Sequence, residues 1–486
     1  MAIKTTPEEA LIGLKKLGKD LDSQQAQILK CEGYYAGAQN LRFATHKFRE
    51  AFGALFREFA DNWMAMVVDT TNSRLGIDGF RFPQTSTQGV TPSSPAPLDL
   101  TGDKEAWEIW QRNSLDRDSK LAHQTALISG RSYVIVGPPI ETNGAPLITV
   151  EHPSQVTVRR SSANRRTRIA ALKAWWDEDE KRMMATLYLP DSISKFQSKG
   201  KQREAKKVCE TNWAGREGVK EVEANPLGIV PVVPLYNKET LLGNGDSEFE
   251  QVIPIQDALN KYMTDMLLAS EFSAFRQRVV IGLATPKDKD GNPLPQADQA
   301  LISAASRFMA FEDDTVKIQE FGTTDLQNYV NAIILCRDHI AARTNTPPHY
   351  LIGSVVNVSG DALKAAESGF VSKIRDRSDY YGEGWEEVMR LAFLIEKDKV
   401  RGAAHQAETI WSDPEVVSES SKADALAKLA ALGLPRQAIW ERYGLSPQEI
   451  ERYLQLEEES VAAGVPSEPE PQALAALLRA AATEGQ

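Results

Sequence analysis

Apolar side chains recur at helical spacing near the start of the chain. They fall every three or four residues, which predicts an amphipathic helix. A threonine, a proline and two acids precede them in Thr6-Pro7-Glu8-Glu9, the order typical of a helix start. We expect this helix to end where Tyr34-Tyr35-Ala36-Gly37 breaks the spacing. The apolar positions are Leu11, Leu14, Leu17, Leu21 and Ile28.

Between residues 48 and 130 the pattern predicts helices and one short strand. An aromatic stripe over residues 48–59 is expected to be core, and residues 77–82 to form a strand. The Pro-, Ser- and Thr-rich stretch Pro83–Leu98 predicts a surface loop. A helix over Lys104–Ile128, introduced by Thr101, should stop at Gly130.

The hydrophobic period changes to two after Ser132. Short alternating segments are split by Asn-Gly, Pro or charged turns, which predicts an antiparallel meander rather than β-α-β units. Asn225–Leu235 should be extended, because proline disfavours the helical region for the residue before it. The expected strands are 133–136, 147–150, 155–158, 171–176 and 183–189.

The longest helical patterns lie in the second half of the chain. Two helical runs, Ser247–Ala274 and Thr324–Thr344, bracket an insert over Phe275–Gly322. A loop of small polar residues, Pro347–Gly360, and another long helix, Asp361–Glu396, follow. Backbone in such a loop needs water or a ligand for its hydrogen bonds. We therefore expect the loop to be a working part of the protein.

Each of the two runs has an apolar face. In the first, Ser247-Glu248-Phe249-Glu250 has the capping-box pattern, and Pro254 either kinks the helix or starts a second one. Asp257, Lys261 and Asp265 recur four residues apart on the opposite face. The residues expected to pack are Ile255, Leu259, Tyr262 and Met266 in the first run and Leu326, Tyr329, Ile333 and Ile340 in the second.

Smaller features complete the predicted elements. The insert has strand-like segments at 279–281, 307–311 and 316–321 and a short helical one at 297–306. Gly382 and Gly384 would permit a kink in the third long helix. The tail is Ala/Leu-rich helix over 422–457, with turns at Gly433 and Gly444, and is expected to be frayed beyond it apart from a helix at 472–481.

The composition indicates a soluble globular protein, and the predicted elements make its fold class α+β and mostly helical. Of its 486 residues, 42% are hydrophobic and 25% charged, enough to bury a core. The formal charge of −11 argues against a basic nucleic-acid grip, since Lys and Arg supply most non-specific affinity for phosphate. The three cysteines indicate neither a disulfide framework nor a thiolate metal site. Neither a signal peptide nor a membrane span is predicted.

Motifs for catalysis are missing from the sequence. It has no phosphate-binding loop, dinucleotide fingerprint, HExxH or GxSxG, and its dispersed histidines are predicted to be structural, so no cofactor or metal is expected. The acidic runs are expected to be solvated turns. A cluster of arginines has two interpretations, a solvated hairpin or a contact with a partner or nucleic acid. It comprises Arg159, Arg160, Arg165, Arg166 and Arg168.

Taken in order, several stretches resemble the portal protein, or head-to-tail connector, of long-tailed bacteriophages. Together they span most of residues 30–400, whereas the tail beyond about residue 415 matches only in its helical character. The stretches are Tyr34–Gly37, Leu41–Ala44, Asp61–Trp63 through Asp78–Arg81, Ser129–Tyr133, Asn225–Leu235, Asp246–Asn260, Pro347–Gly353 and Ser359–Ser368.

The resemblance implies a portal fold with wing, stem, clip and crown regions that assembles into a ring. It implies a structural protein, not an enzyme: a channel at one capsid vertex through which double-stranded DNA is packaged and ejected. The implied regions are an N-terminal wing at 1–240, stem helices at 247–274 and 324–346, a clip at 275–322, a tunnel loop at 347–360, a wing helix and strand at 361–410, and a crown with the C-terminal tail at 415–486.

The resemblance also implies partners and contact residues. A ring of usually twelve copies would meet the capsid protein, any scaffolding protein, the terminase large subunit and later the head-completion adaptor, in the virion and, during assembly, in the host cytoplasm. DNA would pass without sequence-specific binding, and no membrane is implied. The clip residues implied to dock partners are Lys287, Asp288, Lys289, Asp290 and Asn292. Those implied to face DNA are Ile352, Gly353, Ser354, Val355, Val356, Asn357, Val358, Ser359, Gly360, Lys364 and Lys373.

Two other classes stay open. One is another capsid-associated head–tail joining or minor head protein, which the size of the helix–insert–helix segment disfavours. The other is an α+β nuclease, for which turnover of DNA with a divalent metal would be the sign.

Overall fold

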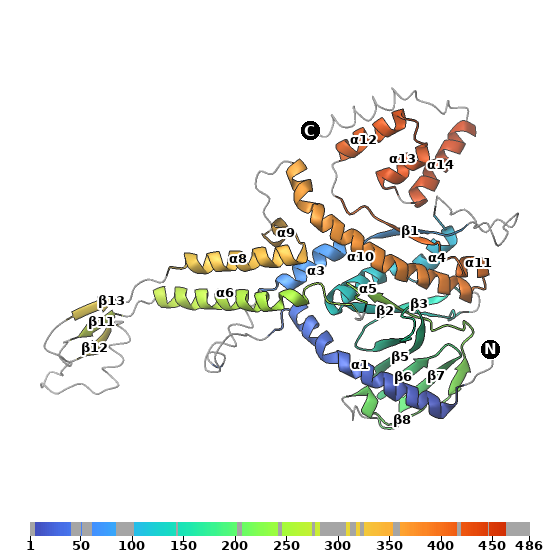
Figure 1. The fold of residues 1–486 in the computed structure, drawn as a ribbon, viewed down its shortest axis with the longest axis horizontal. Coiled ribbons are helices and arrows are strands. Elements are labelled where there is room, and N and C mark those ends of the chain that lie inside the picture. The colour runs from blue at the N-terminus through green and yellow to red at the C-terminus, as the bar shows by residue number, and fades with distance from the viewer. Residues whose placement is uncertain are drawn as a thin grey trace. The chain divides into compact units, whose positions relative to one another are not determined.

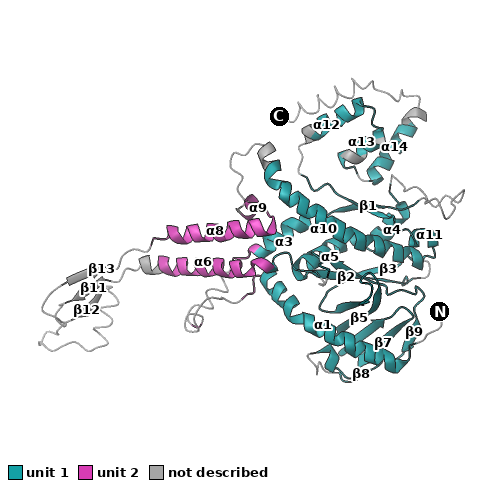
Figure 2. Ribbon diagram, viewed as in Figure 1, with its two compact units in different colours: residues 1–35, 64–250, 354–486 teal, residues 36–63, 251–353 magenta. Residues whose placement is uncertain are grey.

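In a computed structural model the chain divides into two compact units, which Figure 2 colours separately. Unit 1 comprises residues 1–35, 64–250 and 354–486, and unit 2 comprises residues 36–63 and 251–353. The structure describes residues 5–39, 50, 61–83, 102–141, 144–201, 207–241, 245–274, 278–281, 308–311, 317–320, 325–352, 360–415, 419–445 and 447–462.

The first helix, α1 (Pro7–Tyr35), begins and ends where the sequence predicts. Its first turn is capped reciprocally: the Glu9 N–H donates to the Thr6 hydroxyl at 3.3 Å, and the Thr6 N–H donates to the Glu9 carboxylate at 2.9 Å. Gly37 follows the helix with a φ of +69°, a conformation that glycine adopts without a Cβ clash. Local sequence chemistry therefore sets both ends of α1.

The segment predicted as one helix over Lys104–Ile128 forms two. These are α4 (Lys104–Arg112) and α5 (Leu115–Ser129), with a two-residue turn between them. Trp110 and Leu115 are fully buried on either side of the turn. Because burial continues across the break, the hydrophobic spacing alone did not mark it.

The ends of this pair are set by two other residues. Asp103, rather than Thr101, caps α4, since its carboxylate accepts a hydrogen bond from the Ala106 N–H at 2.9 Å. Gly130, with a φ of +81°, ends α5 as predicted. The preceding helix, α3 (Trp63–Ser73), leads into strand β1.

The strands of unit 1 form antiparallel sheets, as the period-two pattern predicts. The smaller central sheet has the order β10-β2-β3, and the larger has the order β4-β5-β6-β7-β8, with β9 paired to β7. Strands β7 to β9 were not anticipated from the sequence. The bounds are β2 Arg131–Gly137, β3 Leu147–Glu151, β4 Val156–Arg160, β5 Arg168–Asp177, β6 Arg182–Tyr188, β7 Ser192–Ser198, β8 Trp213–Gly215, β9 Val222–Ala224 and β10 Val232–Tyr236.

These elements stack in layers. Leu14 and Leu17 of α1 pack against Leu172 and Leu187 on one face of the larger sheet. The smaller sheet packs on its other face, where Ile135 and Val232 meet Ala171. Helices α5 and α10 (Gly360–Ile395) contact the smaller sheet in turn. In Figure 1, α1 and α10 lie on opposite sides of the strands.

Helix α10 runs unbroken through Gly382 and Gly384, the two glycines that would permit a kink. An added Cβ at Gly384 would lie 2.3 Å from Cδ2 of Leu235 in β10, and one at Gly382 would lie 3.2 Å from the indole nitrogen of Trp411. The glycines therefore allow α10 to pack closely against β10 and Trp411.

The remaining elements of unit 1 lie near its C-terminal end. Strand β14 (Glu408–Trp411) pairs antiparallel with β1 (Ile77–Arg81) and so joins distant parts of the chain. Helical segments separated by turns follow in the tail, as predicted. They are α12 Glu419–Ala431, α13 Arg436–Tyr443 and α14 Pro447–Ala462, and one further short helix, α11 Lys399–Gly402, precedes β14.

Unit 2 is built around two helices packed side by side, α6 (Ile253–Ala274) and α8 (Gln327–Thr344). The insert between them contains a three-stranded sheet of order β12-β11-β13, with β11 parallel to β12 and antiparallel to β13. The three predicted strands of the insert are confirmed. Their bounds are β11 Arg278–Ile281, β12 Phe308–Phe311 and β13 Lys317–Glu320.

Two expectations for unit 2 and its flanks need correction. Helix α6 begins at Ile253, so Ser247 does not cap it. Part of the predicted loop over Pro347–Gly360 is helical, as α9 (Pro348–Ile352).

The aromatic stripe at 48–59, most of the loop at 83–98 and the short helix at 297–306 lie largely or wholly outside the described residues. No described helix is long and apolar enough to cross a membrane.

Candidate functional site

Helix α6 carries a row of buried polar side chains. Gln256, Asp257, Asn260 and Thr264 of α6 are all at most 5% exposed. The Gln256 amide donates to the carbonyl of Asp61 at 2.8 Å, and the Asp61 N–H donates to the Asn260 side chain at 3.2 Å. Asp257, predicted on the solvated side, is thus buried. Residue 61, far away in sequence, supplies hydrogen-bonding partners for the neighbouring Gln256 and Asn260.

The residues predicted to pack in the two helices divide into three groups. Leu259 and Ile340 are fully buried, and Tyr262 is 39% exposed. The other five, Ile255, Met266, Leu326, Tyr329 and Ile333, are half-buried. Two further apolar residues of α8, Ile334 and Leu335, are 39% and 59% exposed. The hairpin therefore buries some apolar side chains and leaves others exposed.

Only some of the residues implied to face DNA can be placed. Ile352 ends α9, Gly360 begins α10, and residues 353–359 lie outside the described residues. Lys364 is exposed on α10. Lys373 is 5% exposed, and its ammonium group lies 3.0 Å from the Thr71 hydroxyl and 3.7 Å from Glu248. Its assignment as a DNA-facing residue is wrong in this structure, because internal partners hold the ammonium group.

Lys373 belongs to a buried ion cluster centred on Glu248. The Glu248 carboxylate accepts hydrogen bonds from Arg377, at 3.2 and 3.1 Å, and from Asn237 at 3.2 Å. Lys238 lies 3.3 Å away on the other carboxylate oxygen. Three cations thus surround one anion inside unit 1. In the sequence, Glu248 belongs to the Ser247–Glu250 stretch that we interpreted as a helix cap, so its role in this ion cluster was not predicted.

The charged groups of this cluster shift one another's pKa values. Burial alone would raise the pKa of Glu248, but Lys373, Lys238 and Arg377 outweigh it and hold the pKa below 4.5. Burial lowers the pKa of Lys373 to about 8, because Glu248 only partly offsets desolvation and the two neighbouring cations. Burial and the excess of cations in the cluster therefore both lower the pKa of Lys373.

The arginine cluster on the β4–β5 hairpin is mostly paired with acids of unit 1. Arg159 pairs with Asp20, and Arg160 with Glu239. Arg168 pairs with Glu387 at 2.6 Å. Arg165 also reaches Glu239, at 3.5 Å, whereas Arg166 is exposed. Four of the five arginines are thus engaged internally, which favours the hairpin interpretation over a basic contact patch.

Histidine and metal chemistry find no support among the described residues. His123 is buried, and its Nε2 accepts a hydrogen bond from the Trp385 indole at 2.8 Å. Burial lowers the pKa of His123 to about 3, so the ring stays neutral near pH 7. No group of three or more potential metal-ligating His, Cys, Asp or Glu side chains was found in the part of the chain that the structure describes.

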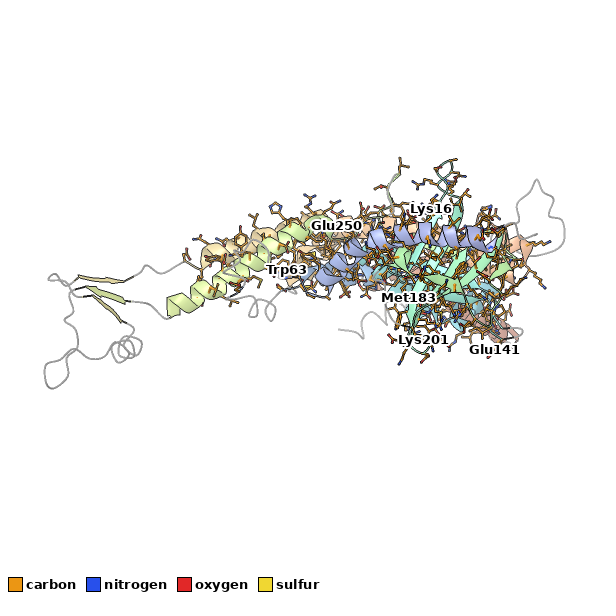
Figure 3. The ribbon with its side chains drawn as sticks, turned by 90° about the horizontal axis from the view of Figure 1, so that it is seen from below. Lys16, Trp63, Glu141, Met183, Lys201 and Glu250 are labelled. Carbon is orange, nitrogen blue, oxygen red and sulfur yellow. The ribbon has the colours of Figure 1, made fainter. Side chains whose placement is uncertain are left out.

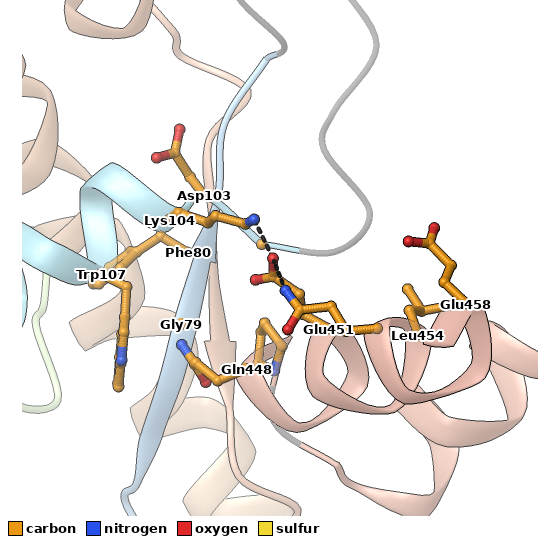
Figure 4. A pocket seen from close by; sticks show the side chains of 12 residues that line it. Gly79, Phe80, Asp103, Lys104, Trp107, Gln448, Glu451, Leu454 and Glu458 are labelled. Atoms are coloured by element: carbon orange, nitrogen blue, oxygen red, sulfur yellow. Dashed lines mark hydrogen bonds and ion pairs between the residues drawn. The ribbon is translucent and has the colours of Figure 1, made fainter. Parts of the chain in front are cut away.

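A cleft of about 410 Å³ lies between β1, the start of α4 and α14 (Figure 4). Trp107 and Leu454 line it, and Lys104 pairs with Glu451 across it. Pro447 would meet a Cβ added to Gly102 at 2.8 Å, so α14 is seated closely here. No histidine, cysteine or serine is among its lining residues.

The implied clip residues, Lys287 to Asn292, lie outside the described residues. Around them the structure describes only the three-stranded sheet β11 to β13 and not its side chains. Their role in docking stays a prediction.

Comparison with known proteins identifies the family. A family model described as phage portal protein, SPP1 Gp6-like, matches residues 14–462. The portal proteins of Mycobacterium phages D29 and L5 are each 30% identical over 415 residues, covering 82% of this chain and 79% of the relative. The resemblance seen in the sequence is thereby confirmed.

Two solved structures of gene transfer agents are also similar. A chain from the virion of a native particle covers 84% of this chain and 95% of its own length, at 12% identity and a TM-score of 0.42. A chain from the neck of the native particle, computed with C12 symmetry, covers 84% and 94%, at 14% identity and a TM-score of 0.39. The family model and the two mycobacteriophage relatives together show that this chain belongs to the phage portal protein family of the SPP1 Gp6-like type, structural phage proteins rather than enzymes.

Proposed function

We propose that copies of this chain form a closed ring at one vertex of a phage capsid, around a channel through which double-stranded DNA is packaged and later ejected. The family assignment supports this role. The observation that carries it is the α6–α8 hairpin. It buries polar as well as apolar side chains, while Tyr262, Ile334 and Leu335 are 39% to 59% exposed. Large apolar side chains exposed on both helices are candidates for an interaction surface, and neighbouring copies would cover them in a ring.

DNA would pass through the channel without being bound tightly. The formal charge of −11 per chain disfavours phosphate binding. We assign the innermost contact to the tunnel loop at 347–360, with Lys364 as a cation that reaches phosphate without reading bases. The phage particle is the proposed site of action, after assembly in the host cytoplasm.

The proposed partners follow the regions of the chain. The clip at 275–322 would dock the terminase large subunit during packaging and the head-completion adaptor afterwards. The wing and crown would contact the capsid protein and, where one exists, a scaffolding protein. Twelve copies per ring is the proposed number.

Negative-stain electron microscopy tests the ring directly. The expected image is a ring with a central channel, taken from purified protein or from particles assembled with the capsid protein. A chain that is monomeric in solution and also forms no ring in particles would contradict the proposal. So would turnover of DNA by the purified chain with divalent metals.

Two variants separate the regions. Deleting residues 352–359 should leave rings intact but abolish DNA packaging or retention, measured as DNA-filled particles; normal packaging would refute the tunnel-loop assignment. Lys287→Glu with Lys289→Glu should weaken terminase or adaptor binding in a pull-down while rings persist. Unchanged binding would remove these lysines from the docking surface.

A further inference from the structure

The hairpin of strands β4 and β5 and helix α10 line one cleft in unit 1. The cleft has a volume of about 1100 Å³ and is also lined by residues of β10 and β14. The charged side chains that line it from the hairpin are all arginines, whereas those that α10 exposes in it are both acidic. The arginines are Arg160, Arg165, Arg166 and Arg168, and the acids are Asp379 and Glu383.

Part of this charge is already paired. Arg168 of the hairpin lies 2.6 Å from Glu387 of α10, and its guanidinium also donates to the Val230 carbonyl at 3.1 Å. Arg160 pairs with Glu239, which follows β10. Among the described residues, the pair of Arg168 with Glu387 is the only one that joins the hairpin to α10. It fixes one point at which the two elements meet.

Other charges in the cleft have no ion-pair partner. Arg166 forms no ion pair with any residue that the structure describes, and within the same ranges neither Asp379 nor Glu383 forms one. Arg165 reaches Glu239 only at 3.5 Å. Charges of opposite sign, from two different elements, therefore line the same cleft without meeting.

The hairpin has an irregularity below its tip. Arg159 of β4 pairs with Ala170 of β5, but Arg160 pairs with Arg168, so Ile169 is left over in the ladder. An extra residue of this kind bends a strand and interrupts its pairing. Ile169 is also 41% exposed, so packing restrains it little. The hairpin thus has a bending point between its base and its tip.

The base of the hairpin is held in the core, whereas the tip is exposed. Ala170 and Leu172 of β5 belong to the core cluster that α1 shares with the larger sheet. Figure 3 shows Lys16 on that helix and Met183 on the strands that it covers. Residues 162–167, in contrast, are all exposed. The tip can therefore move without unpacking the core.

Hydrogen bonds inside the tip keep its shape. The Ser161 N–H donates to the Thr167 carbonyl at 2.9 Å, and the Thr167 N–H donates to the Asn164 carbonyl at 3.0 Å. Because these bonds lie within the turn, the tip can move as a unit about the bending point. Such a movement carries Arg165 and Arg166 with it.

We infer that this tip, residues 161–167, is a flap that closes over the cleft onto α10. In the closed state Arg166 pairs with Asp379 or Glu383, and the structure shows the open state. The two sides complement each other in charge, so the chain itself supplies the occupant of the cleft. Exposed ion pairs contribute little free energy, so both states should be populated. Closure ties the larger sheet to α10 at a second point, beside the existing ion pair.

Distances between two spin labels, measured by electron paramagnetic resonance, test the flap. The labels are attached to Ala163→Cys on the tip and Tyr380→Cys on α10, in a Cys209→Ser, Cys336→Ser background in which Cys31 is buried. An excess of unlabelled chain ensures that each distance lies within one chain. Two distance populations are expected. The shorter should fall about threefold between physiological salt and 1 M, because the Debye length falls from roughly 8 Å to roughly 3 Å.

Charge reversal identifies the residues that close the flap. Arg166→Glu replaces attraction to α10 by repulsion and should reduce the shorter population about threefold at physiological salt. Addition of Asp379→Lys and Glu383→Lys to this variant should restore that population. Asp376→Lys is the matched control, since Asp376 is an exposed acid of α10 that does not line the cleft. It should leave both populations unchanged.

A single distance population that neither salt nor Arg166→Glu changes would overturn the flap. So would a triple variant that stays as open as Arg166→Glu, or a control variant that opens as much. Recovery in the triple variant cannot come from misfolded chains. Each of these results leaves the proposed ring untouched, because the flap involves no neighbouring copy.

Discussion

Arg377 donates two hydrogen bonds to one carboxylate oxygen of Glu248, from Nε at 3.2 Å and from Nη2 at 3.1 Å. The two residues are 129 positions apart in sequence, and their side chains are 7% and 1% exposed. Glu248 is also the anion nearest to the buried Lys373 and to Lys238. One carboxylate therefore balances cations from α10 and from the segment after β10.

Replacement of Glu248 should destabilise unit 1 more than replacement of Lys373. Glu248→Gln removes the carboxylate that Lys373, Arg377 and Lys238 share and should cost about 3–5 kcal/mol of unfolding free energy. Lys373→Met leaves two cations to balance Glu248 and should cost less than half as much. Urea denaturation of both variants measures the difference. Equal losses would mean that Glu248 is not the counter-ion of the whole cluster.

Titration of His123 should make folding sensitive to acid. Burial lowers its folded-state pKa to about 3 from 6.5, so the unfolded chain takes up a proton first as the pH falls. Its contribution to stability is complete above pH 6.5 and is lost below it, at up to about 1.4 kcal/mol per pH unit. His123→Gln keeps an acceptor for Trp385 and does not titrate. Its unfolding free energy should fall less steeply between pH 6.5 and 4.5 than that of the wild type, and parallel curves would contradict the prediction.

Gly384→Ala should destabilise the packing of α10 on β10. The added methyl group would sit 2.3 Å from Cδ2 of Leu235, and relief of such an overlap typically costs about 1–3 kcal/mol. Gly369→Ala is the matched control on the same helix, since its Cβ would meet nothing within 4 Å and alanine favours helix. Thermal unfolding should therefore shift downward for the first variant and not for the second. A neutral Gly384→Ala would show that Leu235 moves aside freely.

Two leucines of the α6–α8 hairpin should behave oppositely. Leu259 is fully buried, so Leu259→Ala should lose about 2–5 kcal/mol and speed hydrogen exchange in α6. Leu335 is 59% exposed, so Leu335→Ser should leave exchange in the monomer nearly unchanged and reduce ring formation instead. Hydrogen–deuterium exchange and mass photometry on the same samples separate the two effects. Rapid exchange in the Leu335→Ser monomer would assign that residue to the interior.

The sequence by itself determined the features that depend on neighbouring residues. The start of α1 follows from Thr6 and Glu9, three positions apart, and its end from the break before Gly37. The alternation after Ser132 predicted antiparallel strands because side chains in a strand point to alternate faces. Order and spacing of short motifs were also enough to place the chain in its family.

Only the tertiary structure decided which polar groups are buried. Asp257 and Lys373 are ordinary helical charges in the sequence, yet both lie inside, because burial of a polar group depends on partners that the fold brings from far away. Lys373 meets Thr71, which is 302 positions distant. Gly384 is a further example. Judged from its neighbours in sequence it only weakens a helix, but in the fold it lets α10 pack closely against Leu235 of β10.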